Sequence, residues 1–174
     1  FRTTKGIAFV TAARTFAGAG LASIDAKGRI TLPSDIRDVL MATSPEHKVC
    51  VSLHDRHDCL VGYGTDEQTR KMADIAFQWE NAVKNDGSYD AEAAAVADYS
   101  LTFTANCEAS GRFVLNPDLR SMAMIEDRAF IYGAGRNFCI WNPNLFLEAQ
   151  LGDSYARLRR YLELQISKDG GRRA

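Results

Sequence analysis

The chain has 174 residues, of which 46% are hydrophobic and 25% charged. This composition is typical of globular proteins, and the length suits one large domain or two small ones. The formal net charge of −1 argues against nucleic-acid binding by bulk positive charge, but it allows a few cations to gather on one face. No apolar run reaches the roughly 18 residues of a membrane span, so we expect an intracellular protein.

The four cysteines, Cys50, Cys59, Cys107 and Cys139, are widely spaced and form no C-x-x-C pair. Disulfide frameworks and structural zinc sites normally show closer, paired spacing. We therefore expect four reduced thiols that pack as small hydrophobic side chains.

Two segments of the chain repeat each other. Residues 25–37 read DAKGRITLPSDIR and residues 108–120 read EASGRFVLNPDLR, an offset of 83. A second match has an offset of 80, where residues 56–60 (RHDCL) align with residues 136–140 (RNFCI). Two matching blocks in the same order indicate a tandem duplication with a slightly shorter loop in the second copy.

Each copy is predicted to contain the same elements in the same order: a tight hairpin, a short helix and two apolar strands. In the first copy Gly28 permits the positive φ of the hairpin turn, and Pro33 opens the helix. The expected ranges are 21–24 and 29–32 for the hairpin, 35–41 for the helix, and 48–53 and 58–63 for the strands. In the second copy the strands are expected at 129–132 and 137–141.

A longer helix is predicted after each copy. After the first, Thr65 and Gln68 have capping-box spacing, and a shorter helical segment follows at 90–97. After the second, Asn142 and Pro143 cap one continuous helix, and residues 168–174 are expected to fray. Both helices have an apolar stripe that could pack the modules or join subunits: residues 72, 75, 76, 79 and 83 in the first, and 147, 151, 155, 158, 162 and 166 in the second.

These elements predict five consecutive parts of the chain. They are an N-terminal tail (1–18), a first module (19–66), a helical connector (67–99), a second module (100–145), and a C-terminal helix with a tail (146–174).

The run Asp25-Ala-Lys-Gly-Arg29, followed by Ile-Thr-Leu-Pro, resembles the signature of the MraZ proteins of the SpoVT/AbrB superfamily, which carry a tandem pair of D-x-x-x-R modules. Residues 59–63 (CLVGY) and 138–141 (FCIW) look like the family's second strand pair. The resemblance covers about residues 19–150. It implies a mainly β fold with flanking helices, α+β overall, built from tandem swapped-hairpin β-barrel modules.

The resemblance also implies a function. Proteins of this type present paired hairpin loops to double-stranded promoter DNA, and MraZ proteins assemble into homo-oligomeric rings. The family regulates the gene cluster for cell division and cell-wall synthesis by binding short G-rich direct repeats in its own promoter. We accordingly expect a cytoplasmic, nucleoid-associated regulator that is not an enzyme and has no cofactor, no membrane partner and no small-molecule substrate.

The first hairpin provides the candidate DNA contacts. The fork of Arg29 suits phosphate or the guanine edge in the major groove, whereas Lys27 suits a point-charge contact with phosphate. Gly28 between them allows a close approach to the backbone. Asp25 is placed to orient the guanidinium of Arg29 by an ion pair, and Arg37 on the short helix is a second candidate for contact with the DNA backbone.

The second hairpin departs from this pattern. Glu108 replaces the aspartate and can still pair with Arg112, but Ser110 stands where the first copy has its lysine. Gly111 keeps the turn, and Asn116 replaces the proline that follows. We expect the second copy to be the structural partner and the first to be the principal reader, with Arg112 as a further candidate contact.

Other interpretations compete with these. A D-x-x-x-R pair is often only a surface ion pair worth less than about 1 kcal/mol, although the repeat favours a role in contact with DNA. An antitoxin-like or scaffold module with a protein partner is the alternative function, but antitoxins of the superfamily usually have a single module. Two further clusters have less support. Residues 157, 159 and 160 are arginines on a helix face, and residues 54, 57, 58 and 59 could ligate a metal only against strand alternation.

Overall fold

The computed structural model describes residues 15–85 and 87–172. Most of the expected N-terminal tail (1–14), Asp86 and the last two residues lie outside this range. The described elements are β1 (Ala19–Ser23), β2 (Arg29–Thr31), α1 (Ser34–Thr43), β3 (Lys48–Leu53), β4 (Leu60–Tyr63), α2 (Thr65–Lys84), α3 (Ala91–Tyr99), β5 (Phe103–Asn106), β6 (Arg112–Val114), α4 (Pro117–Met122), β7 (Arg128–Gly133), β8 (Phe138–Trp141), α5 (Pro143–Glu148), the 3-10 helix η2 (Asp153–Tyr155) and α6 (Ala156–Arg172).

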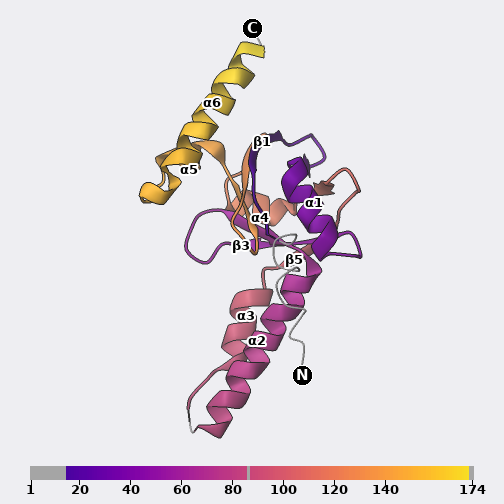
Figure 1. Cartoon of the computed structure of the whole chain (residues 1–174), viewed down its shortest axis with the longest axis vertical. Coiled ribbons are helices and arrows are strands. Elements are labelled where there is room, and N and C mark those ends of the chain that lie inside the picture. Colours follow the sequence, from indigo (N-terminus) through magenta and orange to yellow (C-terminus); the bar gives the residue numbers. More distant parts are fainter. Residues whose placement is uncertain (1–14, 86, 173–174) are drawn as a thin grey trace, which may run out of the picture.

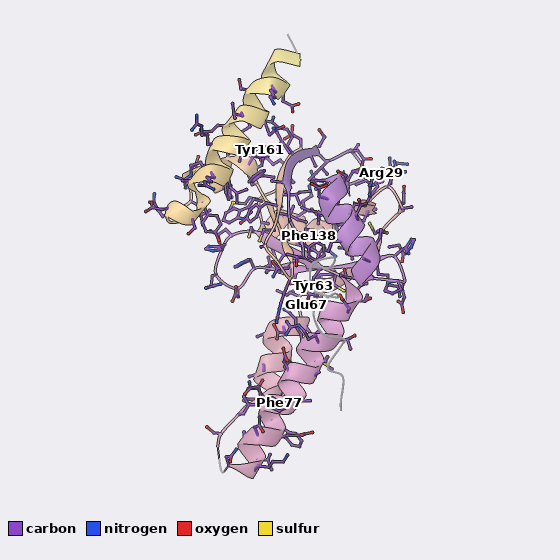
Figure 2. All side chains as sticks on the ribbon, in the orientation of Figure 1. Arg29, Tyr63, Glu67, Phe77, Phe138 and Tyr161 are labelled. Carbon is purple, nitrogen blue, oxygen red and sulfur yellow. The ribbon has the colours of Figure 1, made fainter. Side chains whose placement is uncertain are left out.

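A β-rich body carries a helical projection at each end of its long axis (Figure 1). The arm made of α2 and α3 extends from one end, and α6 rises from the other. Figure 2 shows Phe138 in the body and Phe77 far out on the arm. With helices of 20 and 17 residues in α2 and α6, the chain is an α+β protein rather than a mainly β one. None of the described helices is both long enough and apolar enough to cross a membrane.

The strands of the two copies are interleaved in one antiparallel sheet. Its order is β1-β7-β8-β4-β3-β5. The first strand of each copy therefore pairs with a strand of the other copy: β1 pairs with β7, and β5 pairs with β3. A separate two-stranded ribbon joins β2 to β6. Neither copy completes a sheet from its own strands.

The register of these pairings is symmetric. Leu60 lies opposite Ile140, and Ile30 lies opposite Phe113, so residues that the repeat makes equivalent face each other in both pairings. The sheet order reads the same when the strands of one copy are exchanged for those of the other. The two copies are therefore related by an approximate two-fold rotation through the body.

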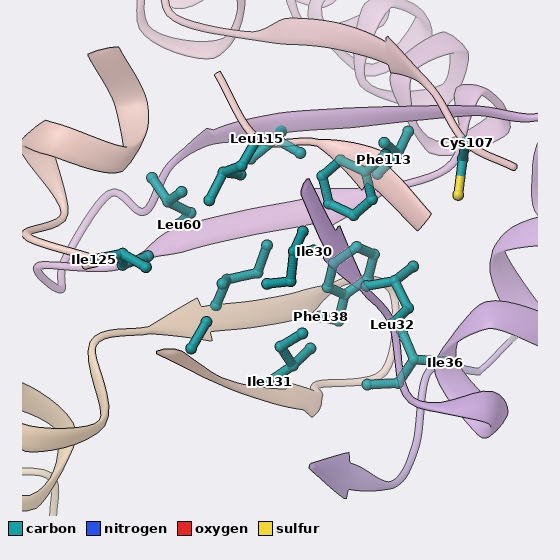
Figure 3. Packing of buried hydrophobic residues seen from close by; sticks show 14 of the residues in the cluster. Ile30, Leu32, Ile36, Leu60, Cys107, Phe113, Leu115, Ile125, Ile131 and Phe138 are labelled. Carbon is teal, nitrogen blue, oxygen red and sulfur yellow. The ribbon is translucent and has the colours of Figure 1, made fainter. Parts of the chain in front are cut away.

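The main core lies between the ribbon and the sheet (Figure 3). Ile30 and Phe113 point inward from the ribbon and are 1% and 2% exposed. They belong to one buried cluster with Leu60, Phe138 and Ile140 of the sheet. Burial of each such side chain stabilises the fold by about 1.5–3 kcal/mol, so the ribbon is attached to the sheet by apolar packing.

A second, aromatic cluster lies under the C-terminal helices. Trp141 and Phe146 pack edge to face, with ring centroids 5.4 Å apart, and the indole N–H of Trp141 donates a hydrogen bond of 3.1 Å to the hydroxyl of Tyr132. Leu162 of α6 is fully buried in the same cluster. The cluster fixes α5 and α6 to the outer side of the sheet.

The capping box predicted at Thr65 and Gln68 does not form at the start of α2. Gly64, not Thr65, is the N-cap residue, and no side chain caps the helix. A Cβ on Gly64 would lie 2.4 Å from the hydroxyl of Thr43, so close packing against α1 requires glycine there. Thr65 instead shares a hydrogen bond of 3.2 Å with the hydroxyl of Ser44.

The single C-terminal helix predicted from the sequence is also wrong, because the structure divides it into α5, η2 and α6. Asn142 does cap α5, where its side chain accepts hydrogen bonds from the N–H groups of Asn144 and Leu145. The chain then leaves the helical path at Ala149 and turns at Gly152. The predicted fraying from residue 168 is likewise wrong, since α6 continues to Arg172.

The N-terminal tail predicted for residues 1–18 extends too far, because Phe16 is packed in the folded body. Its ring is 3% exposed and packs on Phe138 with centroids 5.3 Å apart. Its backbone exchanges hydrogen bonds with Gly135 at 2.7 and 3.1 Å. The residues just before β1 therefore belong to the folded body.

We predict that Gly62→Ala destabilises the protein by about 2 kcal/mol, the usual cost of adding a methylene to a well-packed core. A Cβ on Gly62 would lie 2.3 Å from the buried ring of Phe138. Gly170→Ala is the matched control, because a Cβ there meets nothing within 4 Å and alanine favours the helix. Thermal denaturation should separate the two variants, and equal melting temperatures for Gly62→Ala and the wild type would contradict the packing argument.

Candidate functional site

The first repeated motif forms a tight turn between β1 and β2. Gly28 has φ of +74°, a conformation that glycine adopts without steric cost. The N–H of Gly28 donates to the carbonyl of Asp25 at 2.9 Å, and the N–H of Asp25 donates to the carbonyl of Arg29 at 3.1 Å. Lys27 is exposed at the tip, and no described residue forms an ion pair with it.

The carboxylate of Asp25 organises this turn. One oxygen accepts the N–H groups of Lys27 and Arg29 at 2.9 and 3.0 Å, and the other accepts Nε of Arg29 at 2.6 Å. The backbone N–H of Arg29, and then its guanidinium, lower the pKa of Asp25 below the ordinary 3.8. The ion pair predicted from the sequence is confirmed, and the lowered pKa keeps Asp25 ionised at neutral pH.

The second motif repeats the turn with a longer acid. Gly111 has φ of +84°, and its N–H donates to the carbonyl of Glu108 at 2.8 Å. Nε of Arg112 donates to both carboxylate oxygens of Glu108 at 3.1 Å, and Nη2 lies 3.0 Å from one of them. Glu108 therefore contacts two side-chain nitrogens of Arg112, whereas Asp25 contacts one side-chain nitrogen of Arg29.

The ribbon places both arginines on the same face. In the β2–β6 register Arg29 lies opposite Val114, and Arg112 lies opposite Thr31. Residues directly opposite each other in an antiparallel pair point to the same side, and Ile30 points to the buried side. The outer face of the ribbon therefore presents both guanidinium groups, with side chains 34% and 42% exposed. Figure 2 shows Arg29 at the edge of the body.

Each turn is bonded to the other copy. The N–H of Leu32 donates to the carbonyl of Gly111 at 3.0 Å, and the N–H of Leu115 donates to the carbonyl of Gly28 at 2.9 Å. The two turns therefore move as one rigid unit, and the separation of their arginines is set by main-chain hydrogen bonds.

Two equivalent arginines lie behind the turns. Arg37 on α1 packs against the second turn, so that a Cβ on Gly111 would lie 2.9 Å from its Cγ, and its guanidinium pairs with Asp38 at 2.8 Å. Arg120 on α4 lies close to Gly28 and donates to the carbonyl of Ile125 at 2.9 Å. Arg120 was not among the residues predicted from the sequence, although the offset of 83 identifies it as the equivalent of Arg37.

The other clusters singled out in the sequence do not form a site. No group of three metal-ligating side chains is gathered anywhere in residues 15–85 and 87–172. His54 and His57 lie in the loop between β3 and β4, with their rings tilted and the ring centroids 4.7 Å apart. All four cysteines are buried and free, and burial raises the pKa of the Cys107 thiol to about 11. This thiol is therefore protonated and a poor nucleophile at neutral pH.

The three arginines of α6 do not act as one patch. Arg157 and Arg160 are exposed, but Arg159 donates to the carbonyl of Ala149 at 2.8 Å. That bond holds the loop after α5 against α6, which is a structural role.

Similar proteins are known from several bacteria. A protein of Rhodospirillum rubrum is 33% identical over 144 residues, which are 80% of this chain and 86% of that protein. A protein of Verminephrobacter eiseniae is 30% identical over 140 residues, 78% of this chain and 87% of that protein. A protein of Ruegeria pomeroyi is 29% identical over 149 residues, with shares of 80% and 84%. Each is named Transcriptional regulator MraZ.

The chain belongs to the MraZ family. No family model matches the chain, so membership rests on these similarities, which cover most of this chain and most of each relative. Because the members of this family are named transcriptional regulators, the chain is a transcriptional regulator and not an enzyme. The family resemblance stated from the duplicated motif is therefore confirmed.

We predict that Arg29→Ala raises the pKa of Asp25 but leaves it below 3.8, because the larger contribution comes from the backbone N–H of residue 29, which remains. A carboxyl with a lowered pKa stabilises the fold above its unfolded pKa, and this contribution is lost as the pH falls through the folded pKa. Titration of the Asp25 side-chain carbon by NMR measures both values. An unchanged pKa in the variant would show that the guanidinium does not hold the carboxylate in solution.

Proposed function

We propose that the chain binds double-stranded promoter DNA through the outer face of the β2–β6 ribbon. Lys27 and Arg29 are the principal contacts, Arg112 is a second contact on the same face, and Arg37 contacts the DNA backbone. The observation that carries this proposal is the pair of carboxylate-held arginines that face outward together from one rigid ribbon. The name of the family's members, transcriptional regulator, supports it.

The dimensions of the ribbon suit a groove. The major groove admits a two-stranded β-ribbon. Arg29 and Arg112 are offset by two residues along the ribbon, about 7 Å, which corresponds to about two base-pair steps. A carboxylate that fixes each guanidinium in advance lowers the entropy lost when the side chain binds a base edge or a phosphate.

Arg29 and Arg112 differ in which side-chain nitrogens remain available for contact with DNA. Nε of Arg29 is bound to Asp25, and neither terminal nitrogen of Arg29 donates to a residue within the described ranges, so both can meet guanine O6 and N7. Arg112 has Nε and Nη2 held by Glu108, and Ser110 offers no charge at the tip. This difference supports the first copy as the principal reader.

We extend the proposal to the architecture and the target. The exchange of first strands between copies supports tandem swapped-hairpin modules, here residues 19–66 and 100–145. With few cations to offer at net charge −1, the chain would bind tightly only as a homo-oligomer, in a ring, on several repeats. The proposed target is a set of short direct repeats in its own promoter, before the cell-division and cell-wall genes, so that the protein would be cytoplasmic and nucleoid-associated.

We predict that Arg29→Ala weakens binding to a cognate repeat by about 10–100-fold, since a bidentate guanine contact is worth about 1–3 kcal/mol. Arg112→Ala should weaken binding less, because Glu108 already contacts two of the three side-chain nitrogens of Arg112. Fluorescence anisotropy at a fixed salt concentration measures both affinities. Arg56→Ala is the control, because Arg56 is a 79% exposed arginine in the β3–β4 loop, away from the ribbon. Equal losses for Arg56→Ala and Arg29→Ala would refute the proposed interface.

We also predict that affinity rises steeply with the number of repeats. Later contacts of one assembly become intramolecular, which can raise avidity by about 10²–10⁴. Promoter fragments with increasing numbers of in-phase repeats test this. Insertion of about five base pairs between two repeats should then lower affinity, because readers on one side of a duplex recur about every 10–10.5 bp. Tight binding to one isolated repeat would exclude the multivalent mode.

A further inference from the structure

The helical arm carries an exposed apolar stripe. Met72, Trp79 and Val83 of α2 are 57%, 52% and 64% exposed, and with Ala76 they follow the spacing of one helix face. Neither α2 nor α3 has a single buried residue. Large apolar side chains gathered in this way on a projecting helix usually mark an interaction surface.

The same arm is acidic. Residues 65–99 contain eight acidic side chains and three basic ones. Glu80 follows Trp79 directly, is exposed, and has no ion-pair partner among the residues that the structure describes. The arm therefore combines an apolar stripe with unneutralised negative charge.

The outer face of α6 has complementary properties. Arg157, Tyr161, Leu164 and Lys168 recur with the spacing of one helix face and are all exposed, Leu164 by 54%, whereas Leu162 points into the body. Helix α6 contains five basic and two acidic side chains. Its outer stripe has two apolar groups between two cations, which suits an acidic partner with an apolar stripe.

An apolar hollow adjoins this stripe. It has a volume of about 530 Å³ and is lined by Phe16, Ala17, Gly18, Ala19, Gly133, Arg157, Leu158 and Tyr161. The hydroxyl of Tyr161 donates to the carbonyl of Ala19 at 3.1 Å, which fixes the ring at the edge of the hollow. Arg157 at the rim could stack on an aromatic ring or pair with a carboxylate.

The two surfaces lie at opposite ends of the molecule (Figure 1). Figure 2 shows Phe77 on the arm and Tyr161 on α6, with the whole body between them. One chain therefore cannot bring its own two surfaces together. A contact between two different surfaces of identical chains is heterologous, and it produces a closed ring or an open filament.

We propose that the arm of one chain docks on the outer stripe of α6 in the next chain, with Trp79 at the apolar hollow and Glu80 beside Arg157. The occupant of the hollow is thus a second copy of this chain. The inference rests on the homo-oligomer of the proposed function and identifies the two surfaces that join its subunits. Apolar burial at Trp79 supplies affinity, and the opposite charges select the head-to-tail orientation.

The first test compares two exposed aromatic residues of α2. Trp79→Ala should raise the concentration for half-assembly at least about tenfold, because a buried tryptophan is a common hot spot. Phe77→Ala is the matched control, since Phe77 is 62% exposed but lies on a different side of the helix from the stripe. Sedimentation velocity over a concentration series measures both, and circular dichroism checks that both fold. Equal assembly of Trp79→Ala and the wild type would overturn the proposal, as would a loss confined to Phe77→Ala.

The second test uses charge reversal. Glu80→Arg and Arg157→Glu should each weaken assembly. An equimolar mixture of the two variants should recover it, because every contact between unlike chains again joins opposite charges. An arm-to-arm contact would instead leave assembly of Arg157→Glu unaffected. That result, or a mixture that fails to recover assembly when each variant alone is impaired, would overturn the head-to-tail contact.

The same variants separate this inference from the proposed function. Trp79→Ala should bind a single repeat as the wild type does and lose the additional affinity for an array. A wild type that stays monomeric would refute both the oligomer and this contact. A wild type that assembles and binds arrays, with a Trp79→Ala variant that does the same, would refute this contact alone.

Discussion

The pairing of β2 with β6 is the constraint on which the rest of the structure depends. Only three residues of each strand take part, and the side chains alternate between the two faces of the ribbon. Because Ile30 and Phe113 must enter the core, Arg29 and Arg112 must face outward. A slip of one residue would bury the arginines and expose the apolar pair, so the packing of the core and the exposure of the site are set by the same register.

The exchange of strands explains why the two copies are covalently joined. Each copy supplies β1 or β5 to the edge of the sheet next to a strand of the other copy, so neither half can bury its apolar faces alone. A linker between the copies keeps the partner at a high effective concentration. The same linker forms the helical arm, and in this way a connection needed for folding also provides a surface that projects from the body.

Sequence alone predicted most of the local structure and the centre of the candidate site. The duplicated motif located both turns, and the alternation of apolar residues placed strands β3, β4, β7 and β8 to within about two residues. The ion pair of Asp25 with Arg29 followed from their spacing across a glycine turn. These features depend on residues that are close in the chain, for which spacing and side-chain chemistry are sufficient.

Features that depend on distant residues were not predictable in this way. Alternation shows that a strand has a buried face but not which strand it pairs with, so an exchange of strands could be expected only from the family resemblance and not from the residue pattern. The apolar stripe after Asn142 continues through α5 and α6, which hid the break at Gly152. Thr65 and Gln68 have the spacing of a capping box, yet Gly64 is the N-cap residue of α2, because the close contact with Thr43 requires glycine there. Arg120 could have been found, because the repeat itself pairs it with Arg37.

The approximate two-fold axis of the body bears on the orientation of the DNA repeats in the proposed target. A dimer of identical chains reads an inverted repeat, because its halves are interchangeable. Here the halves are fused and have diverged: one tip carries Lys27 and the other Ser110, and Asp25 and Glu108 hold their arginines differently. The ribbon is therefore not symmetric, and in the proposed DNA interface its reversal on a duplex would exchange the half with Lys27 for the half with Ser110. The proposed interface would therefore favour repeats that all have the same orientation, which is also the arrangement of successive subunits in the proposed head-to-tail assembly.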